Sequence, residues 1–368
     1  MVKNKIGKEK ALSVLKDVIE QKLKGYLPDE YKDAKISFSE VTKNNDEKKT
    51  ALLIQLPDEK VTPTIYLDSF VDMYEDPLTS EDEILSTISD LYVANVKTGD
   101  SFGGKLIDRI SKGFESVKDI IVMQVVNTKM NETSLKDTPH REVEDLSIIY
   151  KLYLDRGIDE SIGTVRISDQ MMEQWGVTEQ ELYDVALKNT KELLPTKILP
   201  MSTVLSVVFG SEEEIPGGGS DLYVITNERK VNGAASVFCD KEAMDELSDK
   251  FNGSMYLIPS SIHEFIALSA EGDHGMDGRT AEIASMIKEV NETTVSPEEI
   301  LGTEPYHYDK ENGFELATKY EERIKGIENP EESEVKTMGF VMKDPTGDSS
   351  VESKDEEPDV AVPSGLHM

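Results

Sequence analysis

Cysteine is almost absent from this sequence of 368 residues, and Cys239 is its single example. One thiol excludes an intramolecular disulfide and any zinc or iron–sulfur site built from several cysteines, and it fits a reducing compartment. Long apolar runs are also missing, because Ile120–Val126 and Leu146–Leu154 are too short or too polar to cross a bilayer. The opening MVKNKIGKEKALSVL lacks the apolar core of a secretory signal. We therefore expect a cytoplasmic protein without a membrane segment.

Positive charge is scarce beside negative charge. The chain has 40 Lys and Arg against 73 Asp and Glu, which gives a formal net charge of −33. Such an excess opposes binding to phosphate backbones and anionic membranes, so we expect no nucleic-acid or membrane partner. Residues 328–368 hold 11 acidic residues, 3 lysines and few large apolar residues. That composition predicts a disordered acidic tail.

Short alternating segments and amphipathic segments follow one another along the chain. Alternation in 36–41 and 51–56 predicts a β-hairpin, and apolar residues at helical spacing between Ala11 and Leu23 predict a helix before it. Thr178-Glu179-Gln180-Glu181 is a capping box that begins another helix. These patterns predict an α+β protein of short mixed or antiparallel sheets with flanking helices. Further strands are expected at 64–67, 120–126, 146–154 and 164–167.

The best internal boundary is Glu212–Ser220, with the sequence EEEIPGGGS. Three consecutive glycines disfavour both helix and strand, so this segment predicts a flexible linker between two α+β lobes. The expected organisation is an N-terminal lobe at 1–211, a linker at 212–220, a C-terminal lobe at 221–327 and a tail at 328–368.

Residues 221–269 hold two polar clusters between short apolar runs. We predict strands at Leu222–Thr226 and Ala234–Phe238, on either side of a turn that contains Asn232-Gly233. The second polar cluster follows at a corner formed by Pro259-Ser260-Ser261-Ile262. A helix at 241–251 and strands at 255–258 and 264–268 complete the segment.

Ser260, Ser261, His263 and Glu264 are the strongest chemical candidates in the chain. A hydroxyl, an imidazole and a carboxylate are the groups of a nucleophile, base and orienter. In a strand, however, His263 and Glu264 point to opposite faces, so both cannot serve one substrate directly. A ligand contact and a structural corner, in which the serines bond to nearby backbone amides, are the alternatives. No catalytic residue is assigned, and His263 with Ser260 or Ser261 is the candidate set.

A second candidate surface is the loop that begins at Asn227. Arg229 in this loop offers a planar fork of donors, which suits recognition of an anion. The alternative is a solvated turn that keeps an edge strand from pairing with another chain. If the strands of this segment form one sheet, the loop lies near the Ser260 corner. The predicted ligand contacts are then Asn227, Arg229, Ser260, Ser261, His263 and Glu264.

No cofactor or metal motif is recognisable. Gly217-Gly218-Gly219 lacks the Lys and Ser/Thr that follow in a phosphate-binding loop. The histidines show no ligand spacing, so the sequence predicts neither a metal site nor a cofactor. They stand at positions 140, 263, 274, 307 and 367.

Six segments stand together in the order of one known family. The chain resembles an uncharacterised family of unknown function from Firmicutes, common in gut clostridia, from about Gly25 to Arg323. The resemblance implies a cytoplasmic bacterial protein of recurrent fold, and the family supplies no activity, substrate or catalytic residue. Its TNxxKxNGAA and PSSIHE motifs stand here at 226–235 and 259–264. The segments are Val41–Asn45, Pro63–Leu67, Pro139–Arg141, Met172–Val177, Leu222–Ala235 and Pro259–Glu264.

The missing cofactor motif, the negative charge and the predicted tail favour a non-enzymatic binding or adaptor protein with an unidentified protein partner. A hydrolase that uses His263 with Ser260 or Ser261 is the alternative. A third hypothesis is an acidic decoy of a nucleic-acid-binding protein, although lysines interspersed near the start argue against continuous phosphate-like spacing. The sequence makes no prediction of oligomeric state.

Overall fold

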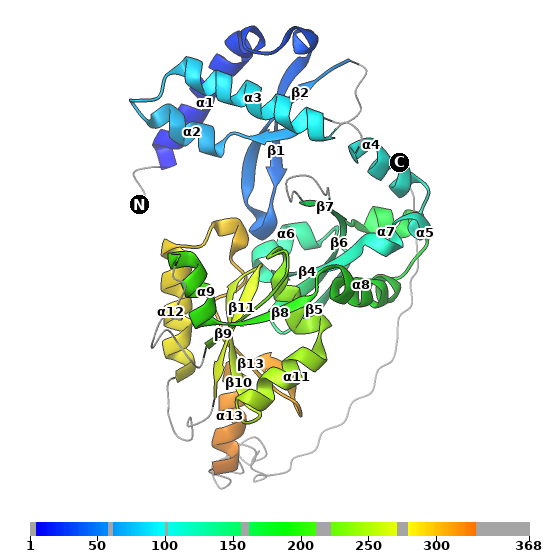
Figure 1. Cartoon of the computed structure of the whole chain (residues 1–368), viewed down its shortest axis with the longest axis vertical. Helices are drawn as coiled ribbons and strands as arrows, with labels where there is room; N and C mark the ends of the chain where they lie inside the picture. The colour runs from blue at the N-terminus through cyan, green and yellow to red at the C-terminus, as the bar shows by residue number, and fades with distance from the viewer. Residues whose placement is uncertain are drawn as a thin grey trace, which may run out of the picture. The chain divides into compact units, whose positions relative to one another are not determined.

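Three antiparallel sheets with flanking helices make up the described part of the chain (Figure 1). The α+β class predicted from the sequence is confirmed. Met1–Glu322 form one unit and Arg323–Met368 another, and all three sheets belong to the first. The structure is a computed structural model that describes residues 5–57, 62–99, 102–155, 162–210, 222–270 and 279–328.

An N-terminal three-stranded sheet packs with helices around its own apolar core. Its elements are α1 (Lys5–Lys22), β1 (Lys35–Thr42), β2 (Lys48–Gln55), β3 (Thr64–Tyr66), α2 (Asp68–Glu75) and α3 (Glu81–Gly99). Leu15, Ile19 and Leu23 are fully buried, which confirms the predicted amphipathic helix. The Tyr92 hydroxyl donates to the Ile54 carbonyl at 2.9 Å and joins α3 to β2. The predicted hairpin is the β1–β2 pair.

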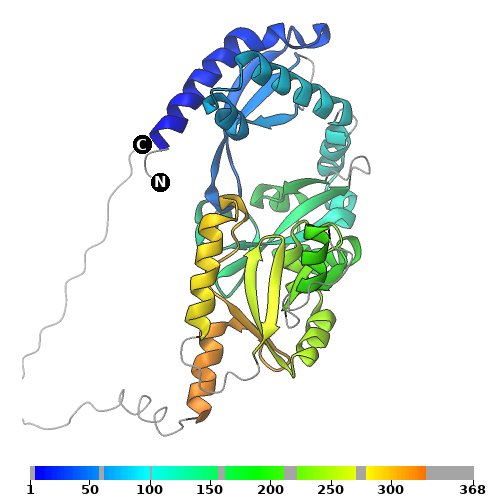
Figure 2. The same cartoon turned by 60° about the vertical axis from the view of Figure 1, so that its left-hand side comes forward.

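The turn of that hairpin reaches residues far away in the sequence. Asn45 and Asp46 both have positive φ, at 61° and 52°. The Asn45 amide donates to the Pro297 carbonyl at 2.8 Å, and Asp46 accepts from the Thr133 and Ser134 amides at 2.7 and 3.0 Å. Both views place the turn beside α6 (Figures 1 and 2). The elements that meet there are η3 (Asn44–Asp46), η5 (Lys129–Asn131), α6 (Glu132–Leu135) and η7 (Pro297–Glu299).

A four-stranded sheet has its longest strand at the centre. Its strands are β4 (Ile121–Asn127), β5 (His140–Val143), β6 (Leu146–Asp155) and β7 (Ile162–Arg166), and β6 pairs with the other three. The capping box at Thr178 and Glu181 is present at the start of α8 (Glu179–Leu193). Leu182 and Ala186 of this helix join the core beneath the sheet. The helices before and after this sheet are α4 (Phe102–Ser111), α5 (Phe114–Val117) and α7 (Asp169–Trp175).

A six-stranded sheet carries the segment with the two polar clusters. Its order is β13-β12-β10-β11-β9-β8. The strands are β8 (Thr196–Pro200), β9 (Leu222–Asn227), β10 (Ser254–Ser261), β11 (Glu264–Ser269), β12 (Tyr306–Asp309) and β13 (Gly313–Leu316). The neighbouring helices are α9 (Met201–Phe209), α10 (Ser236–Cys239), α11 (Lys241–Lys250), α12 (Arg279–Thr293) and α13 (Ala317–Glu328).

The predicted linker at 212–220 falls between two strands of this one sheet. β8 precedes those residues, β9 follows them, and the two strands pair through Ile198 and Ile225. A single apolar core contains buried residues from both sides of the linker, such as Met123 and Phe265. The linker itself and the predicted tail beyond Glu328 lie outside the described residues.

The strand predicted at Ala234–Phe238 is wrong. These residues form η6 (Gly233–Ala235) and α10, and β9 pairs with β8 and β11 instead. A short apolar run reads alike as a buried strand and as a buried helical turn. The burial of Ala234, Ala235 and Val237 decided the pattern, because the run packs beneath the sheet rather than within it.

Candidate functional site

The predicted corner is a tight turn held by its own polar groups. The β10–β11 register shifts between Pro259 and Ser261, as at a β-bulge. The Ser260 hydroxyl donates to Glu264 Oε1 at 3.1 Å, and Ser261 Oγ accepts from the His263 backbone N–H at 3.1 Å. Ser261 therefore bonds a backbone amide, as the structural alternative predicted, whereas Ser260 bonds the Glu264 carboxylate instead.

The His263 imidazole has other partners than the serines. Its Nδ1 accepts from the Asn232 backbone N–H at 3.1 Å, and its Nε2 lies 3.5 Å from Glu299 Oε1. Within this described corner neither Ser260 nor Ser261 hydrogen-bonds to the ring. The nucleophile–base contact that a hydrolase at this corner requires is therefore missing.

Asn227 closes the neighbouring loop. Its side chain is buried, accepts from the Arg229 backbone N–H at 3.0 Å and donates to the Val231 carbonyl at 2.8 Å. These bonds are the Asx-type turn chemistry that favours asparagine at such positions. Arg229 is partly exposed at the same loop. The prediction that Arg229 and the Ser260 corner contact a ligand stays a prediction.

The two polar clusters lie side by side, because β9 pairs with β11 in one sheet. The Thr226 hydroxyl donates to the His263 carbonyl at 2.8 Å. Between them sits Gly233, where an added Cβ would lie 2.3 Å from that carbonyl oxygen and 2.4 Å from Thr226 Oγ1. Only glycine fits at such a distance. The two motifs of the resemblance are therefore two halves of one packing contact.

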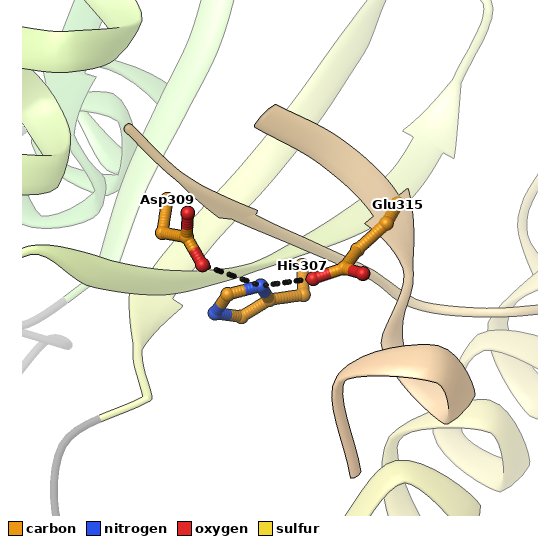
Figure 3. A group of neighbouring side chains, drawn as sticks. All are labelled: His307, Asp309 and Glu315. Atoms are coloured by element: carbon orange, nitrogen blue, oxygen red, sulfur yellow. Dashed lines mark hydrogen bonds and ion pairs between the residues drawn. The ribbon is translucent and has the colours of Figure 1, made fainter. Parts of the chain in front are cut away.

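A buried histidine that the sequence did not single out lies on β12. His307 is 0% exposed, and its Nδ1 lies 3.1 Å from Glu315 Oε1 and 3.8 Å from Asp309 Oδ2 (Figure 3). Its Nε2 lies 2.7 Å from the Ser254 hydroxyl. Burial works to raise the pKa of Asp309, but hydrogen bonds from Asn312 outweigh it and the pKa falls below its usual value. The cluster formed by His307, Asp309 and Glu315 is called the His307 cluster below.

The contacts of Ser254, His307 and Glu315 resemble those of a serine–histidine–acid relay, but substrate has no access to this imidazole. When Nδ1–H donates to the carboxylate, the neutral imidazole accepts a hydrogen bond from the Ser254 hydroxyl at Nε2. The ring, however, is wholly buried, and the Tyr320 ring stacks on it at 3.6 Å. A general base must lie within hydrogen-bond reach of substrate. Because the imidazole is sealed, we assign no catalytic role to it.

A third cluster is basic and lies on the four-stranded sheet. Lys151 and Arg166 are directly opposite each other in the β6–β7 pair, so their side chains share one face of the sheet. Lys43, just before the hairpin turn, holds its ammonium 3.9 Å from the centre of the Tyr66 ring. Among the residues that the structure describes, none of these three cations has an ion pair or a side-chain hydrogen bond. Lys43, Lys151 and Arg166 are called the basic cluster below.

The three cations of the basic cluster act on one another. Burial, together with the positive charges of Arg166 and Lys43, lowers the pKa of Lys151 to about 8. Burial also lowers the pKa of Arg166, although the carboxylate of Asp46 opposes this. Like charges placed opposite each other on a sheet are destabilising. The chain therefore gathers three positive charges here, only partly offset by the carboxylate of Asp46, in an otherwise acidic protein.

An unbonded amide lies beside the basic cluster. Gln124 is 2% exposed, and its Oε1 has no hydrogen-bond partner. Gln124 pairs with Ile149 and Val122 pairs with Lys151, so the Gln124 and Lys151 side chains lie on the same face. Buried polar groups are usually hydrogen-bonded. An unbonded amide next to unpaired cations is typical of a site that binds a polar ligand.

The sequence alone did not predict either cluster. Lys43, Lys151 and Arg166 are far apart in the chain, and their strand register brings them together. His307 and Glu315 are opposite each other in the β12–β13 hairpin. The alternation in Tyr306-His307-Tyr308-Asp309, followed by a turn, was the one signal that placed the histidine and a carboxylate on one strand face.

These features define an α+β protein with a basic cluster on one sheet and a buried histidine–carboxylate cluster on another. The chain belongs to a family of unknown function, DUF5688, whose model matches residues 13–310. That span includes the basic cluster and the Ser260 corner and ends before Glu315. Comparisons with curated proteins and with solved structures gave no match. Across the described ranges, none of the helices has both the length and the apolar character needed to cross a membrane.

Proposed function

We propose that this chain is a non-enzymatic binding protein that takes a dianionic oxyanion group, such as phosphate, at the basic cluster. The observation that carries the proposal is the cross-strand pair Lys151–Arg166, which holds two positive side chains on one face without ion-pair partners in the described chain. Arg presents a planar fork that matches phosphate oxygens, and Lys adds a point charge. Lys43 supplies a third cation, so a doubly charged anion suits the cluster better than a single carboxylate.

The net negative charge of the chain disfavours anion binding elsewhere and so restricts it to this cluster. With a net charge of −33, the protein as a whole repels anions. Tight binding of an anion therefore requires a local site, and a partly buried site strengthens each charge interaction because the effective dielectric is lower. Gln124 adds an amide on the same face. The group supplied to the site is either free phosphate or the phosphate of a modified partner protein.

The test is calorimetric titration of the full chain with inorganic phosphate at constant ionic strength. We expect saturable binding by the wild-type protein and a loss of about tenfold or more in affinity for Lys151→Met and Arg166→Met. A phosphoserine peptide and its unphosphorylated form distinguish the two sources of the group. If the peptide binds more tightly than free phosphate, a modified protein is the partner.

The matched control is Lys188→Met, which removes one lysine from an exposed position on α8. This variant has the same formal net charge as Lys151→Met, so general electrostatics affects both equally. The proposal fails if phosphate binds no better than chloride. It also fails if Lys151→Met binds phosphate as tightly as the Lys188→Met control and the wild type do.

A further inference from the structure

We propose that the His307 cluster is a binding site for a divalent transition-metal ion, of which Zn²⁺ fits best. The site lies on the six-stranded sheet and uses none of the residues of the basic cluster, so it stands apart from the proposed oxyanion binding. The sequence predicted no metal ligands, and the structure brings together an imidazole and two carboxylates that can serve as such.

The donor atoms of the three residues are close enough to share one ion. One ligand atom from each of His307, Asp309 and Glu315 lies within 4.8 Å of the others. The Nδ1–Oε1 and Nδ1–Oδ2 distances are 3.1 and 3.8 Å. Around tetrahedral zinc, with bonds of about 2.0–2.2 Å, neighbouring ligand atoms are about 3.3–3.5 Å apart. Shifts of a few tenths of an ångström bring the two carboxylate oxygens to that spacing from the imidazole nitrogen.

The fold places the three donors without relying on a flexible loop. His307 and Glu315 are directly opposite each other in the β12–β13 hairpin, and Asp309 is two residues from His307 on the same strand face. Their side chains therefore converge from adjacent backbone positions, as Figure 3 shows. Sites built on strands hold their geometry better than sites built on loops.

His307 and Asp309 are also oriented by hydrogen bonds to the atoms that would not bind the ion. With an ion bound at Nδ1, the His307 ring carries its proton on Nε2, which donates to the Ser254 hydroxyl 2.7 Å away and keeps Nδ1 facing the carboxylates. Asp309 Oδ1 accepts the backbone N–H groups of Glu311 and Asn312 at 2.9 and 2.6 Å, so Oδ2 turns toward the imidazole. Hydrogen bonds of this kind fix ring orientation and ligand direction in metal sites.

The chemistry of the donors selects the ion. Two carboxylates beside one buried imidazole nitrogen attract a cation more strongly than they would in water, because the effective dielectric there is lower. An imidazole ligand favours zinc and other transition metals, whereas calcium and magnesium prefer oxygen alone.

The test uses the full chain after dialysis against a chelator. Zinc is titrated by calorimetry in moderate salt, which suppresses weak binding to the acidic surface. We expect one tight equivalent per chain and a rise in the melting temperature at saturation. Binding of Co²⁺ to the wild type should give the intense visible absorption of a tetrahedral site, a readout that needs no variant.

Glu315→Gln and Asp309→Asn remove one carboxylate each while keeping a similar shape. Both should weaken zinc binding by at least about tenfold, with circular dichroism confirming that they fold. Glu311→Gln is the control, because this exposed acid is on the same hairpin and contributes only its backbone to Asp309. Only weak binding of many equivalents, equal in Glu315→Gln and wild type, or Co²⁺ spectra of a fully hydrated ion, would overturn the proposal.

Discussion

Lys151 lies directly opposite Arg166 across the β6–β7 pair, and in the described chain neither forms an ion pair. Like charges directly opposite each other on neighbouring strands destabilise a sheet, because an uncharged or oppositely charged pair is more stable. Stability that is given up at one place is a common sign of a functional site. The relationship therefore has measurable consequences for folding as well as for binding.

Removing the Lys151 charge should stabilise the protein in the absence of a bound anion. The folded-state pKa is about 8, below the ordinary value of 10.5, so the folded state binds the proton less well than the unfolded state. Stability of the wild type should rise between about pH 8 and pH 10.5 as the proton is lost. At pH 7 we expect Lys151→Met to raise the free energy of unfolding by about 1–3 kcal/mol, measured by urea denaturation in a buffer free of phosphate.

The control for that experiment is again Lys188→Met. Its free energy of unfolding should not exceed that of the wild type at pH 7, and it should rise between about pH 8 and pH 10.5 as that of the wild type does. If Lys151→Met is no more stable than this control, then the buried charge is compensated within the folded chain. In that case the oxyanion proposal also loses its energetic argument.

Gly233→Ala should break the contact between the two motif segments. The added methyl would lie 2.3 Å from the His263 carbonyl oxygen, so the β10–β11 corner or the turn after β9 must move. We expect a loss of about 2–3 kcal/mol in the free energy of unfolding. Gly25→Ala is the comparison, because nothing lies within 4 Å of its added Cβ. Equal stabilities of the two variants would show that the corner yields freely.

Asp46→Asn should weaken the docking of the hairpin turn in a way that depends on pH. Burial acts to raise the pKa of Asp46, but hydrogen bonds from Ser134 and Thr133 outweigh it and lower the pKa below 3.8. A lowered carboxyl pKa contributes stability above the unfolded-state value, and this stability is lost as pH falls through the folded-state value. We expect a cost of about 1–2 kcal/mol at pH 7 that shrinks below about pH 4.

Urea denaturation across a pH series measures this difference, and Asn also tolerates the positive φ at position 46. Asp33→Asn, at an exposed position, controls for the general loss of one negative charge. A cost for Asp46→Asn that is unchanged from pH 7 to pH 3 would contradict the assignment of the effect to the carboxylate.

Cys239 should react slowly with thiol reagents in the folded protein. Burial raises the pKa of its thiol to about 12, with the neighbouring charge of Asp240 acting in the same direction. Since the thiolate is the reactive species, we expect labelling to be slower than for free glutathione by about two to three orders of magnitude. Labelling in concentrated urea should restore the ordinary rate. Fast labelling of the folded chain would mean that α10 opens readily.

Local chemistry made several elements predictable. The capping box at Thr178 and Glu181 involves residues three apart, and both of its hydrogen bonds are present. The β1–β2 hairpin and the β10–β11 corner follow from alternation and from turn residues that are neighbours in sequence. Such features depend on side chains within one turn of their own backbone.

Non-local pairing decided what local patterns left open. The run at 234–238 was expected to be a strand, but its burial beneath the sheet made it helical. His263 was the preferred histidine because serines and a carboxylate follow one another around it, yet the tertiary fold gave its ring nitrogens to Asn232 and Glu299. His307 was passed over because its carboxylate partner Glu315 is eight residues away.

The sequence by itself determined the α+β class, the first helix, the hairpin and the corner at Ser260, because these depend on periodicity and on adjacent residues. Only the tertiary structure decided that Lys151 meets Arg166 and that His307 meets Glu315. The physical reason is that strand register and burial arise from contacts between distant segments. Charge, desolvation and ligand geometry at both clusters are consequences of that register.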